Sequence, residues 1–224
     1  MRRAFTLIEL LVTINIMALL AAVLLPVLGM ASDAAGLVRC EQRASQIGHG
    51  LLGYAQDHHG LLPGDLPSTG APDQMWTQLV KRFVDDQADL TAPARFFADP
   101  AMGRCSPLTA FWHSNYALNL YAACRWDSAT WNWGYGPTRL AQIAGPGGTM
   151  LLLGGMRVDG RVISEWHLLV PGSDGQERFV FPHRGRRDAA LFADLHAGMQ
   201  AFAGIPRPAD YAAAMADDYW SMER

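Results

Sequence analysis

The stretch AFTLIELLVTINIMALLAAVLLPVL, Ala4–Leu28, decides the fold, because it is apolar almost throughout and long enough to cross a bilayer. From Leu10 to Leu28 there are 19 residues without a charge. As a helix this run is roughly 28 Å long, which matches a hydrocarbon core of ~30 Å. Two arginines precede it, so the positive-inside rule predicts a cytoplasmic N-terminus and an exported C-terminal domain. We therefore expect a single-pass membrane anchor at residues 5–30.

The rest of the chain has the composition of one modest globular domain. The whole chain has 224 residues, 50% of them hydrophobic, and much of that excess lies in the first thirty positions. The formal net charge of −3 indicates no polyanionic partner, so we expect no binding to nucleic acid. Cysteine is sparse. Cys105 and Cys124 flank an aromatic loop and can form a disulfide outside the cytoplasm, whereas the alternative is three unlinked thiols, Cys40 included.

Glu9 is the unusual residue of the anchor. An acid at the centre of a membrane helix costs about 2.5–3.5 kcal/mol on insertion scales, and less near the interface. An ionisable group in such a segment is by default a functional residue, and a carboxylate there needs a cationic partner. The alternative is a monomeric anchored protein in which the glutamate side chain reaches back to water.

The stretch AFTLIELL, residues 4–11, resembles the cleavage and methylation signal of type IV prepilins and type II secretion pseudopilins. In that family a prepilin peptidase cuts just before the Phe, methylates the new amine and leaves the hydrophobic helix in place. The resemblance implies a leader at residues 1–4, cleavage between Ala4 and Phe5, and Glu9 as the fifth residue of the mature chain. Ala4 is a departure, because the family usually has Gly there, and this bears on the efficiency of cleavage.

The resemblance also implies how the chain assembles. Helices that stack with an axial stagger would bring Glu9 of one subunit to the amino terminus of Phe5 on its neighbour. At 4 Å and an effective dielectric near 20, such a pair attracts by about 4 kcal/mol before desolvation is subtracted. The expected partners are prepilin peptidase, other pilin or pseudopilin subunits and the inner membrane, followed by a filament. A competing hypothesis is a secretory signal cut after Ala31, which would remove the anchor.

Two further stretches resemble a large bacterial pseudopilin-like group. The first is CEQRASQIGHGLLGYAQDHHGLLP, residues 40–63, which resembles the segment after the anchor in that group. The second is HRGRRDAALFADLHAG, residues 183–198, which resembles a C-terminal hallmark of His, nine residues and Asp-Gly-His. Here ten residues separate His183 from Asp194, and Leu195 replaces the Gly. Leu is strained at a positive φ where Gly is not, so the resemblance does not fix the geometry of this turn.

The same C-terminal stretch contains a candidate metal site. His183, Asp194 and His196 offer donor atoms, and an Asp and a His two positions apart on a strand share one face. The pair His58 and His59 offers further ligands. The alternative is structural, with these polar groups capping turns and bonding to the backbone.

The expected fold class is α+β, with a pilin-like layout of one long N-terminal helix packed on a small antiparallel sheet. Apolar residues recur at steps of three and four beyond the anchor, so the helix should continue to about Asp57 and its extramembrane half should occupy residues 31–60. Residues 61–148 are rich in Trp, Pro and Gly and predict loops, with a helix at Gln74–Phe83. Short apolar runs predict the sheet at 149–205, and a last helix is expected at 206–224. The recurring apolar face is Leu37, Cys40, Ala44, Ile47, Leu51 and Tyr54.

Catalytic motifs do not occur in the sequence. There is no nucleophile motif and no phosphate-binding loop, and the scattered Ser, His and Asp residues specify no triad. We therefore expect a structural filament subunit, with no enzymatic activity and no cofactor. Two alternatives stay open: a non-polymerising, membrane-anchored binding module, and a secreted enzyme.

Overall fold

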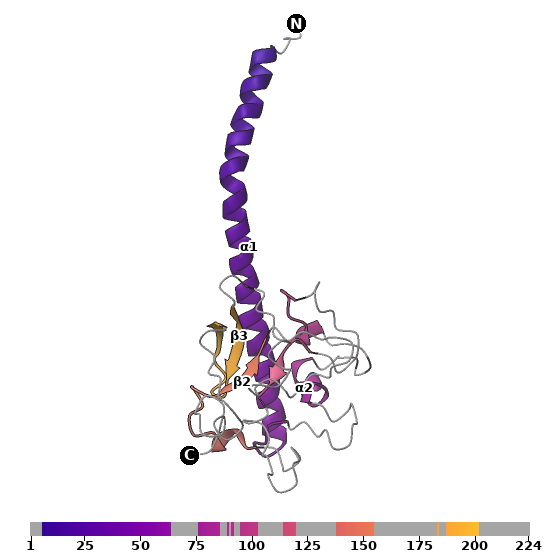
Figure 1. Cartoon of the computed structure of the whole chain (residues 1–224). Helices are drawn as coiled ribbons and strands as arrows, with labels where there is room; N and C mark the ends of the chain where they lie inside the picture. Colours follow the sequence, from indigo (N-terminus) through magenta and orange to yellow (C-terminus); the bar gives the residue numbers. More distant parts are fainter. Residues whose placement is uncertain are drawn as a thin grey trace, which may run out of the picture. The chain divides into compact units, whose positions relative to one another are not determined.

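The computed structural model describes residues 6–63, 76–85, 89, 91, 95–102, 114–119, 138–154, 183 and 187–201. The chain divides into two compact units, residues 1–36 and 37–224. The elements in chain order are α1 (Leu7–Asp57), α2 (Trp76–Val84), η2 (Arg95–Phe97), β1 (Ala117–Leu118), η3 (Leu140–Gln142), β2 (Met150–Leu153), β3 (Arg187–Phe192) and β4 (Ala197–Ala201). The class is α+β, with a long apolar N-terminal helix and a four-stranded antiparallel sheet (Figure 1).

The first unit consists of the N-terminal part of α1. Every residue from Thr6 to Ala35 is exposed, and the large apolar side chains among them are 47–81% accessible to solvent. By length and composition the helix can cross a membrane, with a mean hydropathy of 2.5 over its most apolar window. Pro26 lies inside the helix without ending it. The helix predicted from Phe5 to about Asp57 is confirmed over Leu7–Asp57.

In the second unit, the C-terminal part of α1 is a core element. Its buried face contains Cys40, Ala44, Ile47, Leu51 and Tyr54, as the spacing predicted. This part of the helix lies between the sheet and α2 (Figure 1). At Gly48 and Gly50 the helix backbone lies close to side chains of β3 and α2, respectively. A Cβ added at Gly48 would lie 2.8 Å from Leu191 Cδ1 of β3, and one added at Gly50 would lie 2.9 Å from Val80 Cγ1 of α2.

The sheet has the strand order β1-β2-β3-β4, and all neighbouring strands are antiparallel. In β2 and β3 nearly every residue is buried, so these two strands form the centre of the core. The strand β1 lies within the region that was expected to contain only loops and one helix. It has two residues, which is too short for any hydrophobic alternation to be visible in the sequence.

The helix α1 ends in a tight left-handed turn. His59 and Gly60 have φ of 58° and 83°, and the Gly60 N–H donates to the Ala55 carbonyl oxygen at 2.6 Å. This bond closes the last helical turn, as glycine-containing C-caps do. The sequence HHGLLP thus ends the helix where predicted. After it, the Leu62 N–H donates to the Thr138 carbonyl oxygen at 2.7 Å and ties the exit of α1 to the segment before η3.

Several of the predictions made from the sequence concern residues outside the described ones. They are the cleavage position at Ala4 and Phe5, the cysteines Cys105 and Cys124, and the C-terminal helix at 206–224. The helix expected at Gln74–Phe83 is found at Trp76–Val84, where Trp76 is fully buried and makes an edge contact with the Phe97 ring, with the centroids 5.2 Å apart.

Candidate functional site

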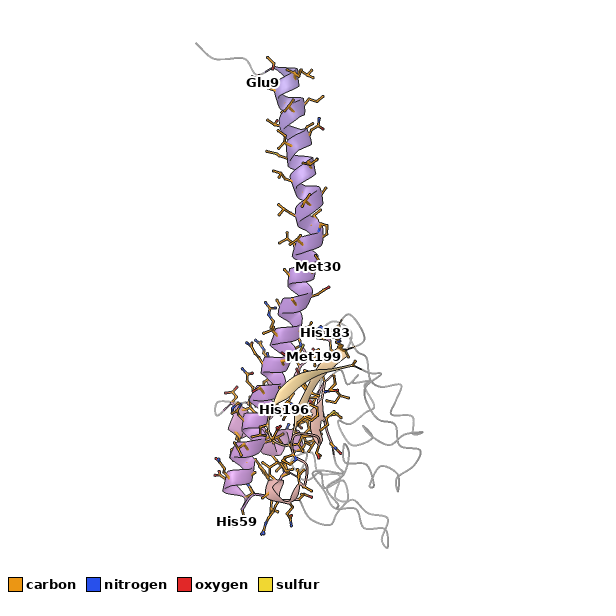
Figure 2. All side chains as sticks on the ribbon, turned by 90° about the vertical axis from the view of Figure 1, so that its left-hand side faces the viewer. Glu9, Met30, His59, His183, His196 and Met199 are labelled. Carbon is orange, nitrogen blue, oxygen red and sulfur yellow. The ribbon has the colours of Figure 1, made fainter. Side chains whose placement is uncertain are left out.

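Glu9 and Thr6 form a reciprocal hydrogen-bonded cap at the start of α1. The Thr6 backbone N–H and hydroxyl both donate to Glu9 Oε2, at 2.9 and 2.7 Å, and the Glu9 N–H donates to the Thr6 hydroxyl oxygen at 3.3 Å. This is a capping box, in which two otherwise unpaired donors of the first turn are satisfied. Sequence reasoning missed it, although Thr6-Leu7-Ile8-Glu9 fits the Thr-x-x-Glu pattern. Glu9 lies at the tip of the helix in Figure 2.

The cap gives Glu9 a local role that is independent of any neighbouring subunit. A glutamine can replace glutamate in a capping box, because the carbonyl oxygen of its amide accepts the same hydrogen bonds. The two roles of Glu9 are therefore separable by mutation: Gln keeps the cap and removes the charge.

Asp194 and His196 belong to the turn between β3 and β4, and not to a strand face as the sequence argument assumed. Asp194 Oδ1 lies 2.5 Å from His196 Nδ1 and accepts the His196 backbone N–H at 3.1 Å. The His196 ring stacks on Phe192, with centroids 4.4 Å apart. Both Asp194 and His196 are exposed. Their contacts are those of a polar pair that closes a turn.

Leu195 is the strained residue of this turn. The Phe192 N–H donates to the His196 carbonyl oxygen at 2.9 Å, which leaves a three-residue loop with Leu195 in its third position. Such loops place this residue in the left-handed region, where glycine is favoured, and Leu195 has φ of 69°. A leucine here stores about 1–2 kcal/mol of backbone strain. The substitution of Leu for Gly, which left the geometry of this turn open in the sequence, thus keeps the positive φ.

A Leu195→Gly variant should be more stable than a Leu195→Ala variant. Both remove the leucine side chain, but only glycine relieves the positive φ. In ordinary ordered positions alanine is more stable than glycine by about 0.5–1 kcal/mol, and here we expect the order to reverse by about 1 kcal/mol. Thermal unfolding of the full chain in detergent, followed by near-ultraviolet circular dichroism, measures the difference. Equal stability of the two variants would contradict the strain.

His183 lies in a different cluster. It forms an isolated bridge with Arg187 at the start of β3, whereas Asp194 and His196 follow the end of that strand. Figure 2 shows His183 and His196 at different ends of the β3–β4 pair. The structure therefore does not bring together the metal set that the sequence suggested. His58 is also elsewhere, stacked on Tyr54 with centroids 3.8 Å apart at the end of α1.

The partners of His183 are Cys40 and Asp99. His183 Nε2 lies 3.3 Å from Cys40 Sγ, and the Cys40 thiol donates to Asp99 Oδ1 at 3.2 Å. One donor atom from each of the three residues lies within 4.8 Å of the others. Cys40 and Asp99 are fully buried, and His183 is half-buried. Three residues that are far apart in the sequence thus meet at the buried face of α1.

Two more buried groups surround this cluster. Asp188 on β3 and Tyr116 before β1 are both inaccessible to solvent. Three buried oxygens have no hydrogen-bond partner among the described residues: Asp99 Oδ2, Asp188 Oδ2 and the Tyr116 hydroxyl. A buried polar atom without a partner costs about 1–3 kcal/mol, so such a concentration needs an explanation.

The electrostatics of the cluster are dominated by burial and by negative charge. Burial raises the pKa of Asp188 to about 8, and the nearby carboxylate of Asp99 adds to the effect. Burial and Asp99 also raise the pKa of the Cys40 thiol. The pKa of Tyr116 is well above its usual value for the same reasons, burial first. The cluster disfavours negative charge and would be stabilised by a cation.

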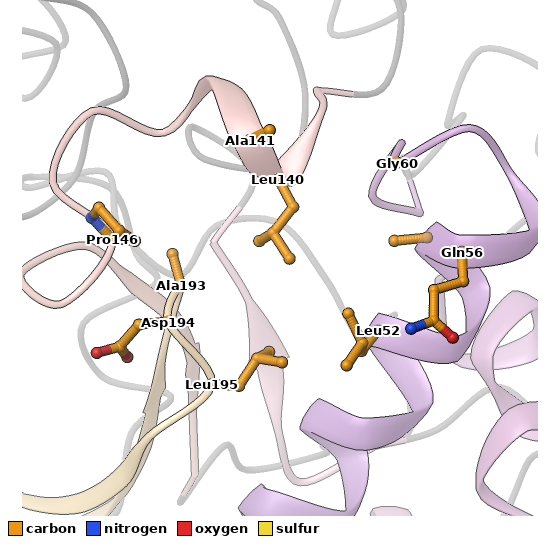
Figure 3. A pocket seen from close by; sticks show the side chains of 10 residues that line it. Leu52, Gln56, Gly60, Leu140, Ala141, Pro146, Ala193, Asp194 and Leu195 are labelled. Carbon is orange, nitrogen blue, oxygen red and sulfur yellow. The ribbon is translucent and has the colours of Figure 1, made fainter.

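A shallow, open depression of about 470 Å³ lies between the end of α1 and the β3–β4 turn (Figure 3). Its walls are mainly apolar and include Leu52, Leu140 and Leu195, with Gln56 and Asp194 as polar side chains. A small-molecule site combines apolar walls with several convergent polar groups. This depression has too few of them to specify a class of ligand.

No family model matches the chain, and no curated protein or solved structure matches it significantly. Function is therefore inferred from the arrangement of its own residues.

Proposed function

We propose that this protein is a pilin-like or pseudopilin subunit that is anchored in the inner membrane by α1, processed by a prepilin peptidase between Ala4 and Phe5, and assembled into a filament. The C-terminal domain would be exported, and its role would be mechanical or adhesive. The observation that carries the proposal is the combination of Glu9 with a run of exposed apolar side chains on the part of α1 in the first unit.

That exposed run needs a nonpolar environment. Residues 7–30 include sixteen exposed large hydrophobic side chains. A contiguous apolar surface of this size marks a contact with a membrane or with another protein. A bilayer covers it before assembly, and neighbouring copies of the helix cover it in a filament. Both environments exclude water, so a carboxylate at Glu9 must be neutralised there, and the ammonium group of Phe5 on a neighbouring mature subunit would do so.

The α+β architecture is compatible with this function. Residues of α1 beyond Gly36 form the core of the second unit, so one continuous helix supplies both an apolar assembly segment and the central element of a globular domain. A subunit of this kind can be extracted from a membrane without unfolding its exported domain.

Determination of the mature N-terminus tests the proposal. We expect intact mass spectrometry of the protein from its native membrane to show a chain that begins at a methylated Phe5. A chain that begins at Met1 would indicate a static anchor, and one that begins at Ser32 would indicate secretion after Ala31. Either of the last two results would contradict the proposed function.

The capping box supports the second candidate, a solitary membrane-anchored binding module. The Glu9 carboxylate already accepts two hydrogen bonds from Thr6, so a monomer does not leave it without a partner. These bonds supply no positive charge, however, and a membrane-embedded anion is stabilised far more by a cation than by neutral donors. The pairing hypothesis therefore accounts for more of the chemistry at Glu9.

A further inference from the structure

We propose that Cys40, Asp99 and His183 form a binding site for a thiophilic divalent cation, Zn²⁺ being the best fit, inside the second unit. Asp99 and Cys40 were not among the expected ligands, and the site is separate from the Asp194–His196 turn. It does not depend on filament assembly, because all three residues belong to the head and lie far along the chain from Glu9.

The donor set suits zinc. Cys sulfur, His nitrogen and Asp oxygen are the three ligand types that Zn²⁺ uses in proteins, at about 2.3, 2.0–2.1 and 2.0–2.2 Å. At tetrahedral angles these bond lengths give a separation of about 3.5 Å between a sulfur ligand and a nitrogen or oxygen ligand. The observed separations are 3.3 Å from Cys40 Sγ to His183 Nε2 and 3.2 Å from Cys40 Sγ to Asp99 Oδ1. An expansion of a few tenths of an ångström would admit the ion.

Charge balance also favours a divalent cation. A thiolate at Cys40 and a carboxylate at Asp99 together neutralise Zn²⁺, with His183 binding as the neutral imidazole, and the thiol proton is released to solvent. A coordinating thiol is deprotonated by the ion itself. The buried site would therefore have no net charge from these four components, which avoids the large cost of an uncompensated buried ion.

The unpartnered oxygens give an independent reason to place a ligand here. Asp99 is fully buried, its Oδ1 accepts from the Cys40 thiol and from the Ala101 N–H at 2.8 Å, and its Oδ2 has no partner. The buried Oδ2 of Asp188 also has no partner among the described residues, and the Asp99 carboxylate is near enough to raise the pKa of Asp188. His183 is the one half-buried residue of the three, whereas Cys40 and Asp99 are fully buried.

Cobalt binding to the full chain, purified in detergent and freed of metal with a chelator, tests the site. Co²⁺ reports zinc-type sites because a sulfur ligand gives a sulfur-to-cobalt charge-transfer band and four-coordinate geometry gives strong visible bands. We expect both kinds of band at one equivalent, their disappearance on addition of one equivalent of Zn²⁺, and a rise in the unfolding temperature with Zn²⁺. Absence of the bands in the unmodified protein would overturn the proposal.

Variants assign the ligands. Cys40→Ser should abolish the charge-transfer band and weaken Zn²⁺ binding by about 100-fold, and His183→Gln should weaken it by at least about tenfold. The matched controls are His196→Gln, which alters the exposed histidine of the turn, and a Cys105→Ser/Cys124→Ser double variant, which removes the other thiols. Both controls should bind as the unmodified protein does.

The result stays decisive even if one variant fails to fold. Should Cys40→Ser unfold, the comparison of His183→Gln with His196→Gln decides, because His183 is partly exposed and its replacement disturbs packing less. Equal affinity in these two histidine variants, or loss of the charge-transfer band in the Cys105→Ser/Cys124→Ser variant, would overturn the assignment. Failure of processing at Phe5 would refute the proposed filament function without affecting this site.

Discussion

A Glu9→Gln variant is expected to insert in the membrane and be cleaved after Ala4, yet fail to enter filaments. Glutamine keeps the capping box with Thr6, so the helix should still begin at the same residue. What it loses is the negative charge. Removal of one partner of a buried ion pair costs about 3–5 kcal/mol, which corresponds to a loss of more than about 100-fold in affinity per subunit contact. The measurement is the fraction of the protein in sheared, sedimented filaments relative to the membrane.

The control for this experiment is Thr6→Ala. It removes the side chain that donates to Glu9 Oε2 at 2.7 Å and keeps the carboxylate. Loss of an N-cap costs about 1 kcal/mol, so we expect assembly to decrease by less than about tenfold. Normal assembly of Glu9→Gln would refute charge pairing. Complete loss of assembly in Thr6→Ala would instead assign the importance of Glu9 to the cap.

A Gly50→Ala variant is expected to destabilise the head by about 1–2 kcal/mol, although alanine is the better helix former. A Cβ at Gly50 would clash with Val84 Cγ2 and lie 2.9 Å from Val80 Cγ1, and these β-branched side chains cannot rotate away freely. Overpacking of this kind costs about 1–3 kcal/mol, against a gain of up to about 1 kcal/mol in helix propensity. Thermal unfolding of the head measures the net effect.

Two further variants separate packing from propensity. Gly29→Ala has nothing within 4 Å of its new Cβ, so it should not destabilise the protein. Val84→Ala in combination with Gly50→Ala should recover part of the lost stability, because it removes the side chain that clashes. If Gly50→Ala is as stable as the unmodified protein, the close approach of α2 to α1 is wrong.

The elements that the sequence predicted well are those defined by local periodicity. The extent of α1 and its buried face from Cys40 to Tyr54 follow from steps of three and four residues, and the helix stop follows from Gly60. The helix α2 was also predicted, although its region shows little periodicity. The positive φ at Leu195 was not predicted, because the replacement of Gly by Leu left the turn geometry open.

What the sequence did not predict depends on contacts between distant residues. Cys40 contacts Asp99 and His183 across separations of 59 and 143 residues, and no spacing rule connects such positions. Asp99 lies in an irregular segment that carried no motif. Nothing in the sequence marks the glycines at 48 and 50 as packing positions. In the structure they are the positions where β3 and α2 come closest to α1, a role that requires knowledge of the neighbours.

The change of α1 from exposed to buried has a consequence for proteolytic release of the second unit. The first buried residue of the helix is Cys40, whereas every residue from Thr6 to Ala35 is exposed. If the chain is anchored as proposed, a protease that cut between Ala31 and Gly36 would release a domain that keeps all the buried residues of α1. Turnover of the exported portion would then require no denaturation, and the detached fragment would be a diffusible, folded protein.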